Sequence, residues 1–216
     1  MQTATARPPA RLQPDLAPIL QDAVNVVHAP RPLDPFLAAR LEAVAQRHDF
    51  AYAVRLDTAA PDPRLLLSAI EDAVAKDFLA ADIRALAAQL GTILGRRHVH
   101  AKLQVIRTDG CRKIHVDHVG LRLICTYAGP GTDWLDNAHL VRENLGRMDV
   151  DIDTANRSVI RAGGALRRCD AGDVLLLKGE GHPGNDGRGA AHRSPPLGAS
   201  GVARLVLKLD EHPCGC

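Results

Sequence analysis

The sequence predicts an α+β fold in which a mostly helical N-terminal half packs on a C-terminal β-core. Before residue 97, apolar residues recur mainly at three- and four-residue steps, which is the period of one helix face. After it, short apolar runs alternate with turns rich in Gly, Asp and Pro, and many short strands of this kind are typical of a sandwich or barrel. A chain of 216 residues, 46% of them hydrophobic, is large enough to bury one such core.

The N-terminal half divides into two predicted parts. Seven of the fourteen Pro lie within residues 1–35, and because Pro neither continues a helix nor donates to a sheet, this segment is predicted to be an extended, docked or partly disordered arm. Residues 36–97 are predicted to be a helical support region, with Asp34 as the N-cap of its first helix and Gly95 ending its last. Its predicted elements are a helix over 36–45, a strand over 50–56, and helical runs over 61–78 and 83–94.

Residues 98–211 are predicted to form the β-core, and residues 212–216 a separate tail that contains His and Cys. The alternation of Val99, Ala101 and Leu103 with polar residues is that of a strand with one buried face. The predicted strands of the core are 98–107, 120–127, 158–161, 165–169, 174–178 and 203–209.

Composition excludes several classes of function. A net charge of +2 falls short of the basic excess that phosphate neutralisation needs, and 3% aromatic residues are few for a protein that stacks bases, so no nucleic-acid partner is expected. No stretch approaches the roughly 20 apolar residues of a membrane span, and the first residues lack the apolar segment of a secretory signal. Five Cys, an odd number, suit reduced thiols. We therefore expect a cytoplasmic protein without a membrane partner.

The clearest candidate site is the tripeptide His115-Val116-Asp117. Residues i and i+2 of a strand point to the same face, so the imidazole and the carboxylate can converge on one ion. His192, 77 residues after His115, supplies a third ligand. Two His and one carboxylate on one face of an ion are typical of non-haem Fe(II) oxygenases, although three protein ligands and a water suit catalytic zinc equally well.

The order of motifs after this tripeptide resembles that of the Fe(II)/2-oxoglutarate oxygenases. A Gly172-Asp173 turn opens an apolar strand before His192, and Arg204 follows this second His by 12 residues. The resemblance implies a double-stranded β-helix, which is a cupin-like or jelly-roll core, with Fe(II) and 2-oxoglutarate as cofactors. It also implies that the planar fork of Arg204 pairs with the far carboxylate of 2-oxoglutarate, which makes this residue both a cofactor-binding and a catalytic candidate.

Four further residues are candidates for the same site. Arg193 and Ser194 directly follow the second His and are expected to help bind the cofactor. Arg122 and Tyr127, in one predicted strand, are candidate catalytic residues that would line the cavity and hydrogen-bond a substrate carboxylate. Because their numbers have opposite parity, at most one of the two faces inward unless a β-bulge intervenes.

A closer resemblance covers most of the chain. The motifs that carry it are CRKIHVD at 111–117, LRL at 121–123, TYAGPGTDW at 126–134, LKGE at 177–180, AHRSP at 191–195 and RLVLKLD at 204–210. In these motifs the sequence resembles the uncharacterised bacterial family known as domain of unknown function 1826. The resemblance implies a cupin-like core and a role in metal limitation, with a zinc metallochaperone as a candidate partner. It implies no particular reaction.

Two hypotheses follow from the candidate site. In the first, an Fe(II)/2-oxoglutarate-type oxygenase acts on a small-molecule or protein substrate that the sequence does not identify. In the second, a non-enzymatic zinc-binding protein of metal homeostasis holds Zn(II) at the same three residues, with Cys111 as a fourth ligand. His212, Cys214 and Cys216 of the tail are further candidate zinc ligands, and a hydrolase that uses zinc-bound water is a variant of this second hypothesis.

Overall fold

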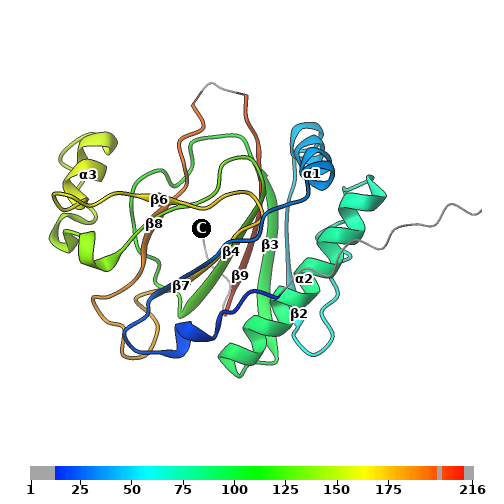
Figure 1. The fold of residues 1–216 in the computed structure, drawn as a ribbon, viewed down its shortest axis with the longest axis horizontal. Helices are drawn as coiled ribbons and strands as arrows, with labels where there is room; N and C mark the ends of the chain where they lie inside the picture. Colours follow the sequence, from blue (N-terminus) through cyan, green and yellow to red (C-terminus); the bar gives the residue numbers. More distant parts are fainter. Residues whose placement is uncertain (1–12, 199–200, 212–216) are drawn as a thin grey trace, which may run out of the picture.

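The computed structural model describes residues 13–198 and 201–211, so the predicted tail at 212–216 and residues 1–12 of the predicted arm lie outside it. Within the described residues the chain forms two antiparallel sheets (Figure 1). The large sheet consists, in spatial order, of β1 (Val26–Ala29), β7 (Val174–Lys178), β4 (Leu121–Ala128), β9 (Arg204–Asp210), β3 (His98–Ile106) and β2 (Ala51–Asp57). The small sheet consists of β6 (Arg167–Arg168), β5 (Asp133–Leu135) and β8 (Ala191–Arg193).

Helices accompany the sheets on two sides. Those within the described residues are α1 (Pro35–Arg47), α2 (Ala73–Leu94), α3 (Ile152–Val159) and the short 3-10 helices η1 (Ala17–Leu20), η2 (Asn137–His139) and η3 (Arg142–Asn144). The side chain of Asp34 accepts hydrogen bonds from the backbone N–H groups of Phe36 and Leu37, which confirms it as the N-cap of α1. α2 ends at Gly95, whose φ of +60° is the left-handed conformation that Gly adopts at low cost.

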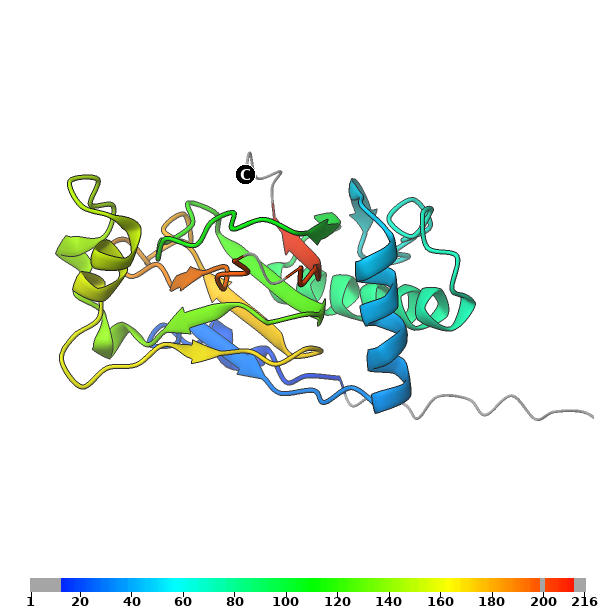
Figure 2. The same cartoon turned by 90° about the horizontal axis from the view of Figure 1, so that it is seen from above.

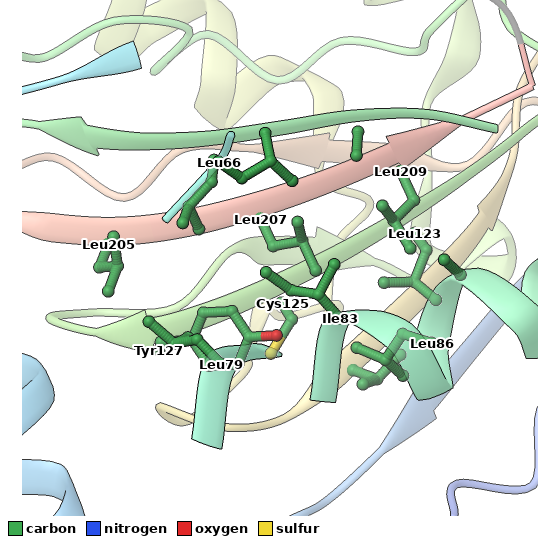
Figure 3. Close-up of a cluster of buried hydrophobic side chains, with 14 of the residues drawn as sticks. Leu66, Leu79, Ile83, Leu86, Leu123, Cys125, Tyr127, Leu205, Leu207 and Leu209 are labelled. Atoms are coloured by element: carbon green, nitrogen blue, oxygen red, sulfur yellow. The ribbon is translucent and has the colours of Figure 1, made fainter. Parts of the chain in front are cut away.

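The main hydrophobic core lies between the large sheet and the helices α1 and α2. Leu79, Ile83 and Leu86 of α2 pack against Leu123 of β4 and Leu207 of β9, and all five are almost completely buried (Figure 3). This core uses alternate residues of each strand, because successive side chains of a strand point to opposite faces. The other residues of β4 and β9 therefore point away from the helices.

The opposite face of the large sheet meets the small sheet. Ile124 of β4, Leu175 of β7 and Val206 of β9 form a second buried cluster with Trp134 of β5. Figure 2 shows the small sheet and α3 on the side of the molecule away from α1 and α2. The space between the two sheets is where the predicted metal ligands lie.

A buried polar network joins the N-terminal segment to the helical side of the core. The guanidinium of Arg31 donates to both carboxylate oxygens of Asp82 in α2, at 2.8 and 3.0 Å, and its backbone N–H donates to Asp173 Oδ1 at 2.8 Å. The hydroxyl of Tyr127 donates to Asp82 Oδ2 at 2.8 Å. Because every charge in this network has a partner of opposite sign or a hydrogen bond, the network can remain buried.

The expectation of a mostly helical N-terminal half is wrong. Two strands of the large sheet, β1 and β2, lie in that half, and β1 falls inside the predicted Pro-rich arm, where it pairs with β7. Residues 61–72 form turns, and the helix starts only after Asp72, which accepts a hydrogen bond from Ala75 N. The two predicted helical runs are joined in the single helix α2, because residues 78–83 between them contain neither Gly nor Pro to end it.

Most of the predicted strands are confirmed, with one exception. The strands predicted at 50–56, 98–107, 120–127, 165–169, 174–178 and 203–209 correspond to β2, β3, β4, β6, β7 and β9. The prediction of a strand at 158–161 is wrong, because Asp151 caps a helix that runs to Val159 and buries Ala155 and Val159 on one side. Sequence reasoning missed β1, β5 and β8, each of only three or four residues. No helix within the described residues is long and apolar enough to cross a membrane.

Candidate metal centre

The structure brings the three predicted metal ligands together. His115 Nε2 lies 3.7 Å from Asp117 Oδ1, and His192 Nε2 lies 3.2 Å from Asp117 Oδ2. One ligand atom from each residue lies within 4.8 Å of the others. Asp117 and His192 are buried, whereas the His115 side chain keeps 34% of its surface exposed, so the cluster is open to solvent on one side.

The backbone holds the two His side by side. His115 and His192 form an isolated antiparallel bridge, in which each backbone N–H donates to the other residue's carbonyl, at 3.0 and 2.9 Å. His192 belongs to β8 and pairs with Trp134 of β5, so the bridge extends the small sheet by one residue. The ring centroids of the two imidazoles are 4.6 Å apart. Their spacing is therefore set by β-pairing and does not require a bound ion.

The loop after β7 holds the backbone of Asp117. Glu180 N donates to Asp117 O at 2.8 Å, and Gly179 N donates to Gly120 O at 2.9 Å. A Cβ at Gly179 would lie 2.1 Å from Val119 O and 2.6 Å from Asp117 O, so only Gly allows this close approach. The carboxylate of Glu180 in turn accepts hydrogen bonds from the backbone within its own loop. The loop is thus a support under the carboxylate ligand.

The hydrogen bonds of the two imidazoles select the nitrogen that faces the cluster. His115 Nδ1 lies 2.9 Å from Lys113 O, and His192 Nδ1 lies 3.1 Å from Ala190 O. A carbonyl oxygen only accepts, so each Nδ1 carries a proton and each Nε2 faces the carboxylate of Asp117, where it offers a lone pair to an ion when the ring is neutral. Lone pairs that converge on carboxylate oxygens repel each other unless a cation lies between them. The donor set therefore fits a metal ion.

Charges around the carboxylate keep it ionised. Burial opposes ionisation of Asp117, but the hydrogen bond and charge of His192 and the charge of Arg122 outweigh it, so the pKa of this carboxyl lies well below its usual value. Burial and the neighbouring His192 lower the pKa of His115, which favours its neutral form. An ionised carboxylate and a neutral imidazole are the forms that bind metal.

Arg122 lines the cavity, as predicted, but its guanidinium is committed to protein carboxylates. Nη1 donates to Asp117 Oδ2 at 2.7 Å, while Nε and Nη2 donate to the two oxygens of Asp210 at 2.6 and 2.9 Å. Arg122 and Asp210 lie on the neighbouring strands β4 and β9 and are directly paired in register. The geometry makes Arg122 a positioning residue for the carboxylate ligand.

Arg204 lies in the same cavity and has a different environment. Only 1% of the residue is exposed, and its guanidinium donates to Pro130 O at 2.7 Å and to the hydroxyls of Thr126 and Thr132 at 3.2 and 3.4 Å. Among the described residues no carboxylate forms an ion pair with it, and burial lowers the pKa of Arg204 to about 10. At neutral pH it is therefore a buried cation with no carboxylate of the described residues in ion-pair contact, although the charge of Asp133 favours its protonated form.

The other candidate residues divide between the cavity and the core. Arg193 and Ser194 line the cavity, and Arg193 Nε donates to Asp133 Oδ2 at 3.0 Å. Cys111 is exposed at the cavity wall and does not belong to the cluster of three ligands. The expectation that Tyr127 lines the cavity is wrong: it is fully buried on the helical face, where its hydroxyl contacts Asp82.

The alternation of side chains along β4 explains why Arg122 faces the cavity and Tyr127 does not. The register of β4 against β9 shifts between Thr126 and Ala128, which is the bulge that would be needed for both Arg122 and Tyr127 to face the cavity. However, Tyr127 packs with Cys125 on the helical face, as simple alternation from Arg122 predicts.

Sequence reasoning missed several residues around the cavity. On β9, the residues at two-residue steps from Arg204 are Val206, Lys208 and Asp210, and the first two line the cavity with it. The period of two along the predicted strand was the signal that could have found them. No comparable signal pointed to Thr132, which lies in a loop.

The described residues thus form a candidate mononuclear metal centre of two His and one carboxylate, set between two antiparallel sheets. The family model described as "Protein of unknown function (DUF1826)" matches residues 11–210, and the chain belongs to this family. No curated protein matches the sequence.

Several solved structures are similar to the chain at low sequence identity. A prolyl-4-hydroxylase from Pseudomonas putida is 16% identical, with a TM-score of 0.46 over 95% of this chain and 98% of that chain. A dioxygenase for auxin oxidation from rice is 16% identical, with a TM-score of 0.45 over 90% of this chain and 76% of that one. AviO1 from Streptomyces viridochromogenes is 17% identical, with a TM-score of 0.41 over 87% and 90%. Likeness at this level assigns no reaction to the chain.

Proposed function

We propose that this protein is an Fe(II)/2-oxoglutarate-dependent dioxygenase whose two sheets form a double-stranded β-helix. The observation that carries the proposal is the buried Arg204, which forms no ion pair among the described residues and lies in the same cavity as the cluster of two His and one Asp. Its guanidinium hydrogen-bonds to a carbonyl and to hydroxyls but forms no ion pair with a carboxylate of the described residues, and a buried charge without an ion pair favours a ligand that brings a carboxylate into the cavity.

The residues that would hold each group follow from their chemistry. His115, Asp117 and His192 supply the two nitrogens and one carboxylate of a facial metal site. Arg204 would pair with the distal carboxylate of 2-oxoglutarate, and the hydroxyl of Thr126 is placed beside it as a further donor. When bound, Fe(II) and 2-oxoglutarate supply an oxidation in which dioxygen inserts one oxygen atom into the substrate while the cosubstrate becomes succinate and CO2.

The remaining residues position and shield these groups. Arg122 holds the carboxylate of Asp117 in place and balances its charge. The carbonyl groups of Lys113 and Ala190 fix the tautomers of the two imidazoles. Ile124 and Val206, together with the small sheet, exclude water from the floor of the cavity.

The alternative is a non-enzymatic zinc protein of metal homeostasis that uses the same three ligands, with a metallochaperone as its partner. A structural zinc site has four protein ligands and no open coordination position. Among the described residues the cluster offers three, because Cys111 lies outside it. Three ligands with an open side favour a centre that binds a further ligand, and the oxygenase proposal is therefore preferred.

Anaerobic addition of Fe(II) and 2-oxoglutarate tests the proposal. We expect a weak visible charge-transfer band, and succinate formation in air, for the wild type and for a control variant at the exposed neighbour, His118→Ala. His115→Ala should lose both signals. Arg204→Lys should raise the concentration of 2-oxoglutarate needed for the band by about tenfold or more, because Lys lacks the bidentate fork. If the wild type shows no band, makes no succinate and purifies with zinc rather than iron, the proposal is wrong.

A further inference from the structure

We propose that Lys102 and Lys208 together bind an anionic group, a carboxylate or a phosphate, of the primary substrate. The proposal rests on the proposed function in taking the metal cavity as the place of reaction, but the binding it predicts can be measured without turnover. Neither lysine belongs to the metal cluster or hydrogen-bonds to Arg204. The anion that they bind is therefore assigned to the primary substrate, which adds a substrate class to the proposed function.

The two lysines lie directly opposite each other on neighbouring strands. In the antiparallel register of β3 and β9, Lys102 pairs with Lys208, two positions along from the pair of Gln104 with Val206. Side chains of directly opposed residues leave the sheet on the same face, with Cβ atoms about 4.5–5.5 Å apart. That face is the one toward the metal, because Val206 and Lys208 both line the cavity.

The described residues give neither ammonium group an anionic partner. Among the described residues, no ion pair or side-chain hydrogen bond involves Lys102 or Lys208. Two carboxylates on the same side of the sheet, Asp117 in the cavity lining and Asp210 two residues after Lys208, are both engaged by Arg122. Like charges placed directly opposite each other in an antiparallel pair destabilise the sheet. An anion held between them would remove that repulsion.

The surroundings leave room for such an anion. The small sheet covers the face of β4 and β7, but over β2 the residues on the Lys102 side are small or exposed: Ala53 pairs with Lys102, and Arg55 pairs with His100. Ala53 and Arg55 are both exposed. A substrate can therefore lie across β3 and β2 with its anionic group at the lysine pair and another part extending into the cavity.

The lysine pair is separate from the cosubstrate residue. Arg204 precedes Lys208 by four positions on β9, which is roughly 13 Å at about 3.3 Å per residue of strand. Arg204 is also buried among threonine hydroxyls, whereas Lys208 is only partly buried and faces the open side. One short dicarboxylate cannot use Arg204 for one end, chelate the metal with the other and also engage the lysine pair.

Binding of small anions to the metal-loaded protein tests the proposal. The probes are inorganic phosphate, benzoate and the neutral isostere benzamide, titrated at constant ionic strength with the unfolding midpoint as the signal. We expect phosphate or benzoate, and not benzamide, to stabilise the wild type. Lys102→Met and Lys208→Met should each weaken that binding about fivefold, as expected for one partly exposed charge contact, and the double variant should abolish it. Lys76→Met, on α2 behind the sheet, is the matched control and should bind as the wild type does.

Each result decides the proposal. Equal stabilisation of the wild type and the double variant, or no stabilisation by either anion, overturns it, and the stronger of the two anions identifies the group recognised. A separate titration with 2-oxoglutarate should be affected by Arg204→Lys and not by Lys208→Met. If Lys208→Met abolishes 2-oxoglutarate binding, Lys208 belongs to the cosubstrate and the proposal is wrong. If 2-oxoglutarate fails to bind at all while the anions bind through the lysines, only the proposed function fails.

Discussion

At the scale of single residues, the carboxylate ligand depends on one guanidinium. Arg122 is 2% exposed and joins Asp117 to Asp210, so it neutralises two carboxylates that are themselves buried. Removing one partner of a buried ion pair costs more than the pair itself contributes, because the remaining charge stays without compensation. Metal affinity and folding are therefore linked at this residue.

We predict that Arg122→Met lowers the free energy of unfolding by about 3–5 kcal/mol and weakens metal binding about 10- to 100-fold, since a residue that holds a ligand in place is lost. Urea unfolding and Co(II) titration measure the two effects. Arg122→Lys keeps the charge but lacks the planar fork of the guanidinium. Its free energy of unfolding and its metal affinity should therefore lie between those of Arg122→Met and the wild type. Unchanged affinity and stability in Arg122→Met would show that Asp117 is held by other contacts.

The same variant should respond differently to acid. The pKa of Asp117 in the folded protein lies below its ordinary value, so the stability that its ionised form contributes is present above that ordinary pKa and is lost as the pH falls through the folded pKa. Without Arg122 the folded pKa rises. Acid unfolding and metal release of Arg122→Met should therefore begin at a higher pH than in the wild type.

Some of these residues could be predicted from the sequence and others could not. His115 and Asp117 were predictable because two positions of separation already place them on one face. His192 and Arg204 were found by the order of motifs. The partnership of Arg122 with Asp210 joins positions 88 residues apart and depends on which strands become neighbours, which no local pattern specifies.

At the scale of elements, β4 separates two kinds of chemistry by its alternation. Arg122, Ile124 and Thr126 face the small sheet, whereas Cys125 and Tyr127 face α2. Whether a side chain of this strand faces the small sheet or α2 therefore depends on whether its residue number is even or odd.

We predict that Tyr127→Phe leaves metal binding and 2-oxoglutarate turnover unchanged and lowers the free energy of unfolding by about 1 kcal/mol. The substitution removes one buried hydrogen bond to Asp82, which keeps both bonds from Arg31. Steady-state succinate formation and urea unfolding measure the two quantities. A loss of turnover at unchanged stability would give Tyr127 the catalytic role that its place in the core argues against.

The errors in predicting elements have physical causes. The helix expected from residue 61 starts at 73, after turns and the Asp72 cap. Several apolar residues before it are buried although they lie in turns, so their spacing resembled that of a helix face. At 158–161, a short apolar run between turns was predicted to be a strand, but the cap at Asp151 lies seven residues earlier and determines the helix. Short strands such as β5 and β8 form only because a partner strand is beside them.

At the scale of the whole molecule, the N-terminal segment is an integral part of the sheet. β1 forms one edge of the large sheet, and Arg31, just after it, inserts its guanidinium between α2 and β4. This segment therefore connects the helical layer to the sheet, whereas its Pro content predicted an arm without regular structure.

We predict that Arg31→Met lowers the free energy of unfolding by about 3–5 kcal/mol, because Asp82 then stays buried without its cation. Hydrogen exchange should show the amides of β1 losing protection before those of β9. Arg40→Met, which breaks a half-exposed ion pair with Asp72, is the matched control and should cost at most about 1 kcal/mol. Equal effects of the two substitutions would contradict the special role of the buried network.

The backbone bridge between His115 and His192 has a mechanical consequence. An ion bound by both imidazoles would close the chain between them into a ring, joined at one point by a pair of amide hydrogen bonds and by ligand bonds. If the chain is pulled from its two ends, the segment inside that ring bears no tension until the hydrogen bonds and ligand bonds that close the ring break. At about 3.3–3.6 Å per extended residue, the metal-loaded chain would stretch roughly 250 Å less than the metal-free chain. The centre would then determine the contour length of the protein under tension, independently of any reaction it supports.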